Sequence, residues 1–116
     1  MARFLVHLAT GPENPTRVAL ALLVARTAAA EGHEVAVFLA GDAVHLAREE
    51  TAAAVHGVGT GSVAEHLAAL RDAGTDVYLS GLSSKARGIE APDWAQAAPP
   101  ETLVELAVWS ETALTY

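Results

Sequence analysis

Hydroxyl and cationic side chains gather in the short segment that follows the apolar run at residues 77–79. The segment contains Ser80, Ser83 and Ser84, then Lys85, which is the only lysine of the chain, and Arg87. Serines at the start of a helical turn can cap it, and the free N–H groups of that turn attract anions. Two positive charges on an acidic chain strengthen the attraction. The pattern predicts a site for a small anion or a nucleotide. The alternative is ordinary helix capping beside two solvated cations.

Two further polar residues are expected near this turn. Asn14 follows the apolar run at residues 4–9, and Asp42 follows the run at residues 35–40. In parallel α/β sheets, ligands bind beyond the carboxyl ends of the strands, where such residues meet. We therefore expect both side chains to join the anion site. An alternative for Arg87 is a structural ion pair with an acid such as Glu90.

Other kinds of site have weaker support. Ser80 could be a nucleophile if His7 or His45 served as its base and Asp42 oriented that histidine, but the segment lacks the Gly-x-Ser-x-Gly elbow. None of the five histidines has a metal-ligand spacing. Residues 57–62 resemble a phosphate loop without its Gly-Lys-Ser/Thr ending, and we interpret them as a flexible approach to the next helix. We predict no catalytic residue, no metal and no cofactor.

Charge and composition exclude several classes of protein. The chain has 14 acidic and 7 basic residues, for a net charge of −7. Nucleic acids and anionic membranes repel such a chain, so we expect neither as a partner. The longest apolar run, residues 18–25, is too short to span a membrane, and the first residues lack a signal peptide's apolar region; we expect a cytoplasmic protein. Because the chain has no cysteine, disulfides, zinc–thiolate sites and thiol catalysis are excluded.

Apolar runs typical of strands alternate with helical patterns along the chain. Strands are expected at residues 4–9, 35–40, 76–79 and 113–116, and helices at residues 15–31, 42–48, 62–74 and 101–109, with a short helix after the serine turn. The glycine-containing residues 49–61 and the proline-rich residues 90–100 are expected to be loops, the first of them partly mobile. This order predicts a three-layer α/β/α sandwich with a mainly parallel sheet of four to five strands, in a single domain of residues 1–116.

The first helix bears on assembly. From Val18 to Ala25 it is apolar all round, whereas a helix that covers one sheet face normally carries a polar outer stripe. We expect its outer face to contact another subunit. The alternative is that a neighbouring helix of the same chain, for example the C-terminal one, covers it.

Nearly the whole chain resembles the DsrE/DsrF-like family of small sulfur-metabolism proteins. The matching segments are residues 4–9, 11–15, 32–38, 41–44, 73–78, 86–89 and 113–116. The resemblance implies a compact α/β sandwich that assembles as a homotrimer, a homohexamer or a mixed ring with a paralogue of the family. In the sulfur-relay branch of the family, a cysteine after the third strand accepts a persulfide and passes it on, for example toward tRNA thiolation.

This sequence departs from the relay pattern at the cysteine. The resemblance places that cysteine at Ser80, seven positions before the arginine of the Arg87-Gly88 pair, and a second frequent cysteine or polar position at Ser83. A neutral hydroxyl cannot carry a persulfide. We therefore expect a DsrE-like oligomer without persulfide chemistry that binds a small anion at this turn. The alternatives are a structural or interaction subunit of a sulfur-relay system and a serine-dependent hydrolase or transferase.

Overall fold

A five-stranded parallel sheet forms the centre of the computed structural model, which describes residues 1–116. The strands run in the order β6-β5-β2-β1-β7, and every neighbouring pair is parallel. Their bounds are β1 (Arg3–Leu8), β2 (Glu34–Leu39), β5 (Asp76–Ser80), β6 (Gln96–Ala98) and β7 (Thr112–Thr115). The predicted α/β sandwich with a mainly parallel sheet of four to five strands is confirmed.

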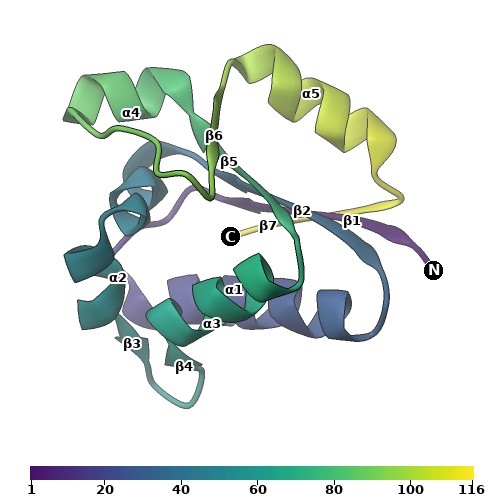
Figure 1. Ribbon diagram of the computed structural model, residues 1–116, viewed down its shortest axis with the longest axis horizontal. Helices are drawn as coiled ribbons and strands as arrows, with labels where there is room; N and C mark the ends of the chain where they lie inside the picture. Colours follow the sequence, from purple (N-terminus) through teal and green to yellow (C-terminus); the bar gives the residue numbers. More distant parts are fainter.

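Helices cover both faces of the sheet (Figure 1). The helices α1 (Pro15–Ala30) and α3 (Val63–Asp72) lie on one face, and α4 (Gly81–Arg87) and α5 (Pro100–Trp109) lie on the other. Asn14 caps α1 by accepting a hydrogen bond from the N–H of Arg17, and proline occupies the first helical position, where no N–H is needed. No helix combines the length and apolar character needed to cross a membrane.

The core is unequal on the two sides of the sheet. A cluster of 20 buried residues joins the sheet to α1, α3 and the segment between β2 and α3. The other face carries a cluster of four, Leu5, Ala36, Phe38 and Ala98, against which Leu103, Leu106 and Trp109 of α5 pack. No residue of α5 is itself buried, so this helix covers the sheet but keeps its outer side in solvent.

Two segments expected to be loops contain regular structure. The 3₁₀ helix η1 (Gly41–Ala47) lies where the short helix at residues 42–48 was expected. The expected loop at residues 49–61 instead contains the helix α2 (Glu49–Ala54) and a hairpin of β3 (His56–Gly57) with antiparallel β4 (Gly61–Ser62). The hairpin docks on α1, where the N–H of Val58 donates to Oγ1 of Thr16 at 3.1 Å. Residues 96–98, within the other expected loop, form β6. The loop prediction was therefore wrong for most of residues 49–61 and for residues 96–98, whereas residues 90–95 are irregular as expected. The β3–β4 hairpin and β6 could not be anticipated because distant parts of the chain, α1 and β5, stabilise them.

The apolar first helix is covered mainly from within the chain. Val18, Leu22 and Ala25 are fully buried, and α3 and the β3–β4 hairpin pack along α1. The alternative expectation, a neighbouring helix, is therefore correct for most of α1, although the C-terminal α5 lies on the opposite face. Leu20 remains 40% exposed, and contact of that side with another subunit stays a prediction.

Candidate functional site

The segment with Ser80, Ser83 and Ser84 forms the start of α4, directly after β5. We call this segment, together with Lys85 and Arg87, the α4 turn. Ser80 is the N-cap residue, and its Oγ accepts a hydrogen bond from the N–H of Ser83 at 3.1 Å. The helix ends at Gly88, whose φ of 65° lies in the left-handed region that glycine adopts without a steric penalty. The Ser80 oxygen is thus engaged by the backbone of its own helix.

An ion pair between Asp42 and Arg87 joins η1 to α4. Nε and Nη2 of Arg87 donate to Oδ1 of Asp42 at 3.2 and 3.0 Å, and Nη1 donates to the backbone oxygen of Ser83 at 3.1 Å. Ser83 Oγ in turn accepts from the N–H of Gly41 at 2.8 Å. The structural ion pair given as the alternative for Arg87 is therefore present, but its acid is Asp42 and not Glu90. The fold brings these predicted residues together, but their polar groups bond to one another.

The remaining predicted residues are placed differently. Lys85 is exposed and forms no ion pair. Ser84 is 5% exposed, and its hydroxyl is the one buried side-chain polar atom without a hydrogen-bond partner. Asn14 lines a separate hollow together with Arg17 and Tyr116. The main cavities of the molecule are lined by residues outside the α4 turn, so an anion there would meet Lys85 at the surface.

Neither histidine suggested as a base is hydrogen-bonded to Ser80, whose hydroxyl accepts from the N–H of Ser83. His7 is on β1, which is separated from β5 by β2, and its closest polar side-chain partner is Thr115, at 3.5 Å. His45, in η1, makes no side-chain hydrogen bond to a serine. A serine hydroxyl without a neighbouring base is a weak nucleophile, so the arrangement does not support a serine-dependent reaction. No three histidine, aspartate or glutamate side chains are grouped to hold a metal ion.

An aromatic row, which local sequence patterns do not reveal, crosses the sheet on the α5 side. His7, Phe38 and Tyr78 stand in register on β1, β2 and β5, with ring centroids 6.2 and 6.3 Å apart. Burial lowers the pKa of His7. Burial and then the Asp76 carboxylate raise the pKa of Tyr78. The alternation of side chains along a strand indicates which face of the sheet each ring occupies. Only the strand order and the register place the three rings in one row.

A second group not anticipated from the sequence lies on the opposite side of the sheet. The Arg71 guanidinium carbon is 5.4 Å from the centroid of the Trp94 ring, and both residues line a cavity of about 450 Å³. Arg71 belongs to α3 and Trp94 to the segment before β6, so no sequence spacing connects them.

Comparisons with known proteins agree with this architecture. Among solved structures, the ychN protein from E. coli superposes with a TM-score of 0.81 over 100% of both chains at 19% sequence identity, a likeness that shows the fold. The search of curated proteins gave no match. The family model described as "DsrE/DsrF-like family" matches residues 2–115. The chain belongs to the DsrE/DsrF-like family.

Proposed function

We propose that this chain is a member of its family that builds an oligomer and does not carry sulfur. The observation that supports the proposal is Ser80, which occupies the position where the resemblance expects cysteine and whose hydroxyl caps α4. Persulfide transfer needs a thiolate that attacks sulfur and then holds it. A neutral hydroxyl does neither, and the chain has no cysteine elsewhere to supply the thiol.

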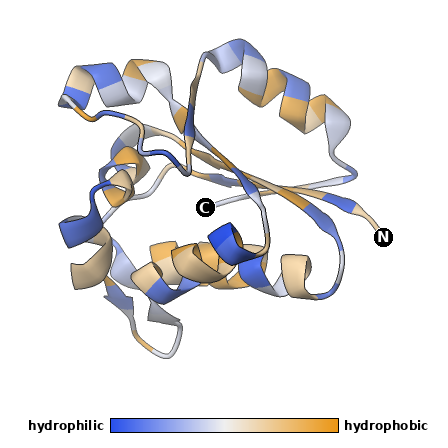
Figure 2. Cartoon of the chain, viewed as in Figure 1, coloured by the Kyte–Doolittle hydropathy of each residue, from blue (hydrophilic) through white to orange (hydrophobic).

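The surface proposed for assembly lies on the outer side of α5. Val104 and Val108 are 64% and 81% exposed, and their spacing of four residues puts them on one side of the helix. We call this pair the α5 surface; Figure 2 shows apolar residues along this helix. On α4, which covers the same sheet face, Leu82 is 67% exposed. Several large apolar side chains exposed on one side of a molecule are typical of an interaction surface.

The proposed occupant of the α5 surface is a second copy of the chain. Contact there would remove the two valines from water, which favours association. The trimer and hexamer implied by the resemblance are the expected assemblies. A cysteine-bearing paralogue in a mixed ring is the alternative occupant.

Light scattering coupled to size-exclusion chromatography tests the assembly. We expect the unmodified chain to run as a trimer or hexamer, and Val104→Glu/Val108→Glu to dissociate while keeping its circular dichroism. The control is Val58→Glu, because Val58 lies at the tip of the β3–β4 hairpin and is 87% exposed. The hairpin lies on the side of the sheet opposite α5 (Figure 1), so this variant should stay assembled. A folded monomer of the unmodified chain, or equal dissociation of the control, would contradict the homo-oligomer. Co-purification with a paralogue would favour the mixed ring.

Anion binding at the α4 turn is the second candidate function, favoured by the unpaired Lys85 beside Arg87. Thermal-shift measurements with phosphate, sulfate, sulfite and nucleotides test it. Stabilisation that disappears in Lys85→Ala/Arg87→Ala would support the site. Because Asp42 neutralises Arg87, Asp42→Asn should strengthen the response to anions. No stabilisation by any of these anions, or an unchanged response in the double variant, would remove this candidate.

A further inference from the structure

A cavity distinct from the α4 turn opens between α2, α3 and the segment that precedes β6. Its volume is about 450 Å³, within the usual range for small-molecule sites. Seven of the nine residues that line it are hydrophobic: Leu46, Ala47, Ala52, Ala53, Ala64, Leu67 and Trp94. Leu46, Ala52 and Leu67 are buried. The other two are Glu49 and Arg71.

Small side chains explain why the space is open. Four of the lining residues are alanines, contributed by η1, α2 and α3. Where two helices approach each other, leucine or isoleucine side chains normally fill the space between them. Alanine leaves that space empty while it keeps the walls apolar. An apolar group that entered from water would gain contact with this surface.

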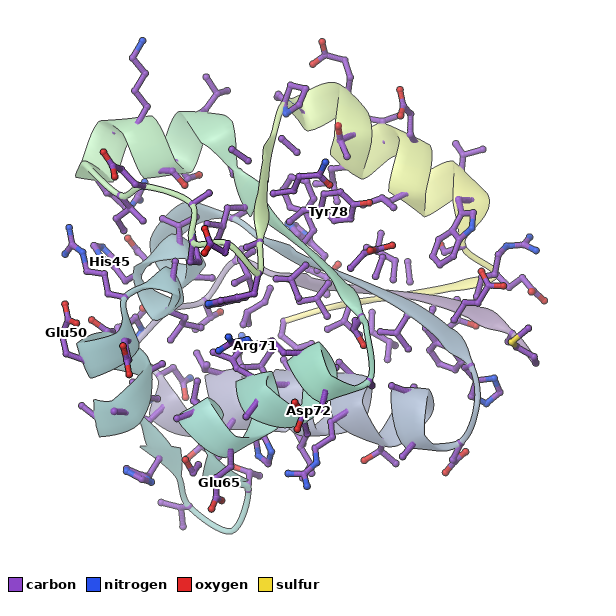
Figure 3. All side chains as sticks on the ribbon, in the orientation of Figure 1. His45, Glu50, Glu65, Arg71, Asp72 and Tyr78 are labelled. Carbon is purple, nitrogen blue, oxygen red and sulfur yellow. The ribbon has the colours of Figure 1, made fainter.

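Arg71 is the one cationic residue among those that line the cavity. The Arg71 guanidinium lies over the Trp94 ring at 5.4 Å and has no carboxylate within salt-bridge distance. Figure 3 shows its side chain rising from α3 toward the sheet, whereas Glu65 and Asp72 lie below on the same helix and Glu50 points outward from α2. The ring holds the planar guanidinium in place while its N–H groups stay available. A guanidinium so placed suits a carboxylate, which it can bind through two parallel hydrogen bonds.

We propose that this cavity binds a small monocarboxylic acid with an apolar body, its carboxylate on Arg71 and its body against Leu46, Leu67 and Trp94. Glu49, on the α2 wall, is also without an ion pair. Its charge repels a second carboxylate, so the cavity accepts one negative group at the α3 side and none at the α2 side. This site is independent of the proposed assembly surface and of the α4 turn.

Isothermal titration of the full chain with benzoate, 3-phenylpropionate, hexanoate and octanoate tests the proposal. At least one acid should bind saturably, with the weak affinity expected of so few atoms. The amide of the best acid lacks the charge and should bind about tenfold more weakly or worse. Phenylsuccinate, which carries a second carboxylate, should bind more weakly than 3-phenylpropionate. Absence of saturable binding of all four acids below about 10 mM, or equal binding of acid and amide, would overturn the proposal.

Variants locate the binding within the cavity. Arg71→Gln should weaken the best acid about tenfold or more, whereas Arg48→Gln, which removes an exposed charge from a residue that does not line the cavity, should change it less than about twofold. Ala64→Leu should fill the space and abolish binding. Because that change could disturb α3, Ala53→Leu, on the exposed α2 wall, serves as a second filling variant. Unchanged binding in Arg71→Gln, or in both filling variants when folded, would show that the acid binds elsewhere.

Discussion

The Asp42–Arg87 ion pair should couple η1 to α4 measurably, although it lies at the surface. The Arg87 and Asp42 side chains are 29% and 54% exposed, so water screens much of their attraction, and exposed pairs contribute about 0.2–1 kcal/mol. Two guanidinium N–H groups share one carboxylate oxygen, and a third binds the Ser83 carbonyl. This geometry favours the upper end of that range. We expect a coupling free energy of about 0.5–1 kcal/mol between the two side chains.

A double-mutant cycle of Asp42→Ala, Arg87→Ala and the double variant measures this coupling. Unfolding in urea is followed by circular dichroism at one fixed protein concentration, because assembly would make stability depend on concentration. Arg87→Ala should cost more than the coupling alone, since it also leaves the Ser83 carbonyl without its donor. In about 1 M salt, where charges are screened beyond about 3 Å, the coupling should fall clearly.

The exposed Arg3–Glu111 pair provides a matched control. Its atoms are 3.8 Å apart and its side chains are 46% and 52% exposed, so its coupling should be smaller, below about 0.5 kcal/mol. A coupling of zero between Asp42 and Arg87 at low salt would refute the reasoning. So would a coupling that does not change with salt, because it would not be electrostatic.

Three other predictions concern the sheet and the loop before α1. Burial lowers the pKa of His7 in the folded chain below its ordinary value of 6.5. At a pH between the folded and the ordinary pKa, the unfolded chain therefore binds more protons at His7 than the folded chain does. The stability that comes from keeping His7 neutral is fully present above pH 6.5 and is lost as the pH falls toward the folded pKa. His7→Gln should therefore flatten the dependence of the urea midpoint on pH between about pH 7.5 and about pH 5. A profile as steep as that of the unmodified chain would contradict this account. Phe38 is 2% exposed, so Phe38→Ala should reduce the free energy of unfolding by about 3–5 kcal/mol. Val58 is 87% exposed, so Val58→Ala should change it by less than about 0.5 kcal/mol. Equal losses in the two variants would be inconsistent with Phe38 as a core residue. In Gly11→Ala, the new Cβ would overlap the backbone oxygen of Asp42, so thermal unfolding should show a loss of about 1–3 kcal/mol; unchanged stability would mean that this loop is not packed on η1 as described.

Local chemistry in the sequence was enough to predict the main elements and the fold class. Continuous apolar runs such as residues 35–39 are typical of parallel strands covered on both faces. Asn14 before Pro15 marks the start of the helix expected at residues 15–31, through capping that depends on a few neighbouring residues. The absence of cysteine excluded thiol chemistry without reference to any structure.

The weak elements could not be predicted in this way. β6 has only three residues, and it is a strand because it pairs with β5. The β3–β4 hairpin is similarly short and docks on α1 through Thr16. Such segments carry no pattern strong enough to identify them, because the partners that stabilise them lie far along the chain.

The sequence by itself determined that this is an acidic α/β protein with hydroxyls and cations, and no thiol, after its third long strand. Only the tertiary structure decided what those groups contact: Arg87 meets Asp42, 45 positions earlier, and Arg71 meets Trp94 over an alanine-lined cavity. The physical reason is the range of the interactions. Periodicity and capping act over a few residues, whereas an ion pair or a cavity depends on strand order and helix packing, which bring distant residues to within a few ångströms of each other.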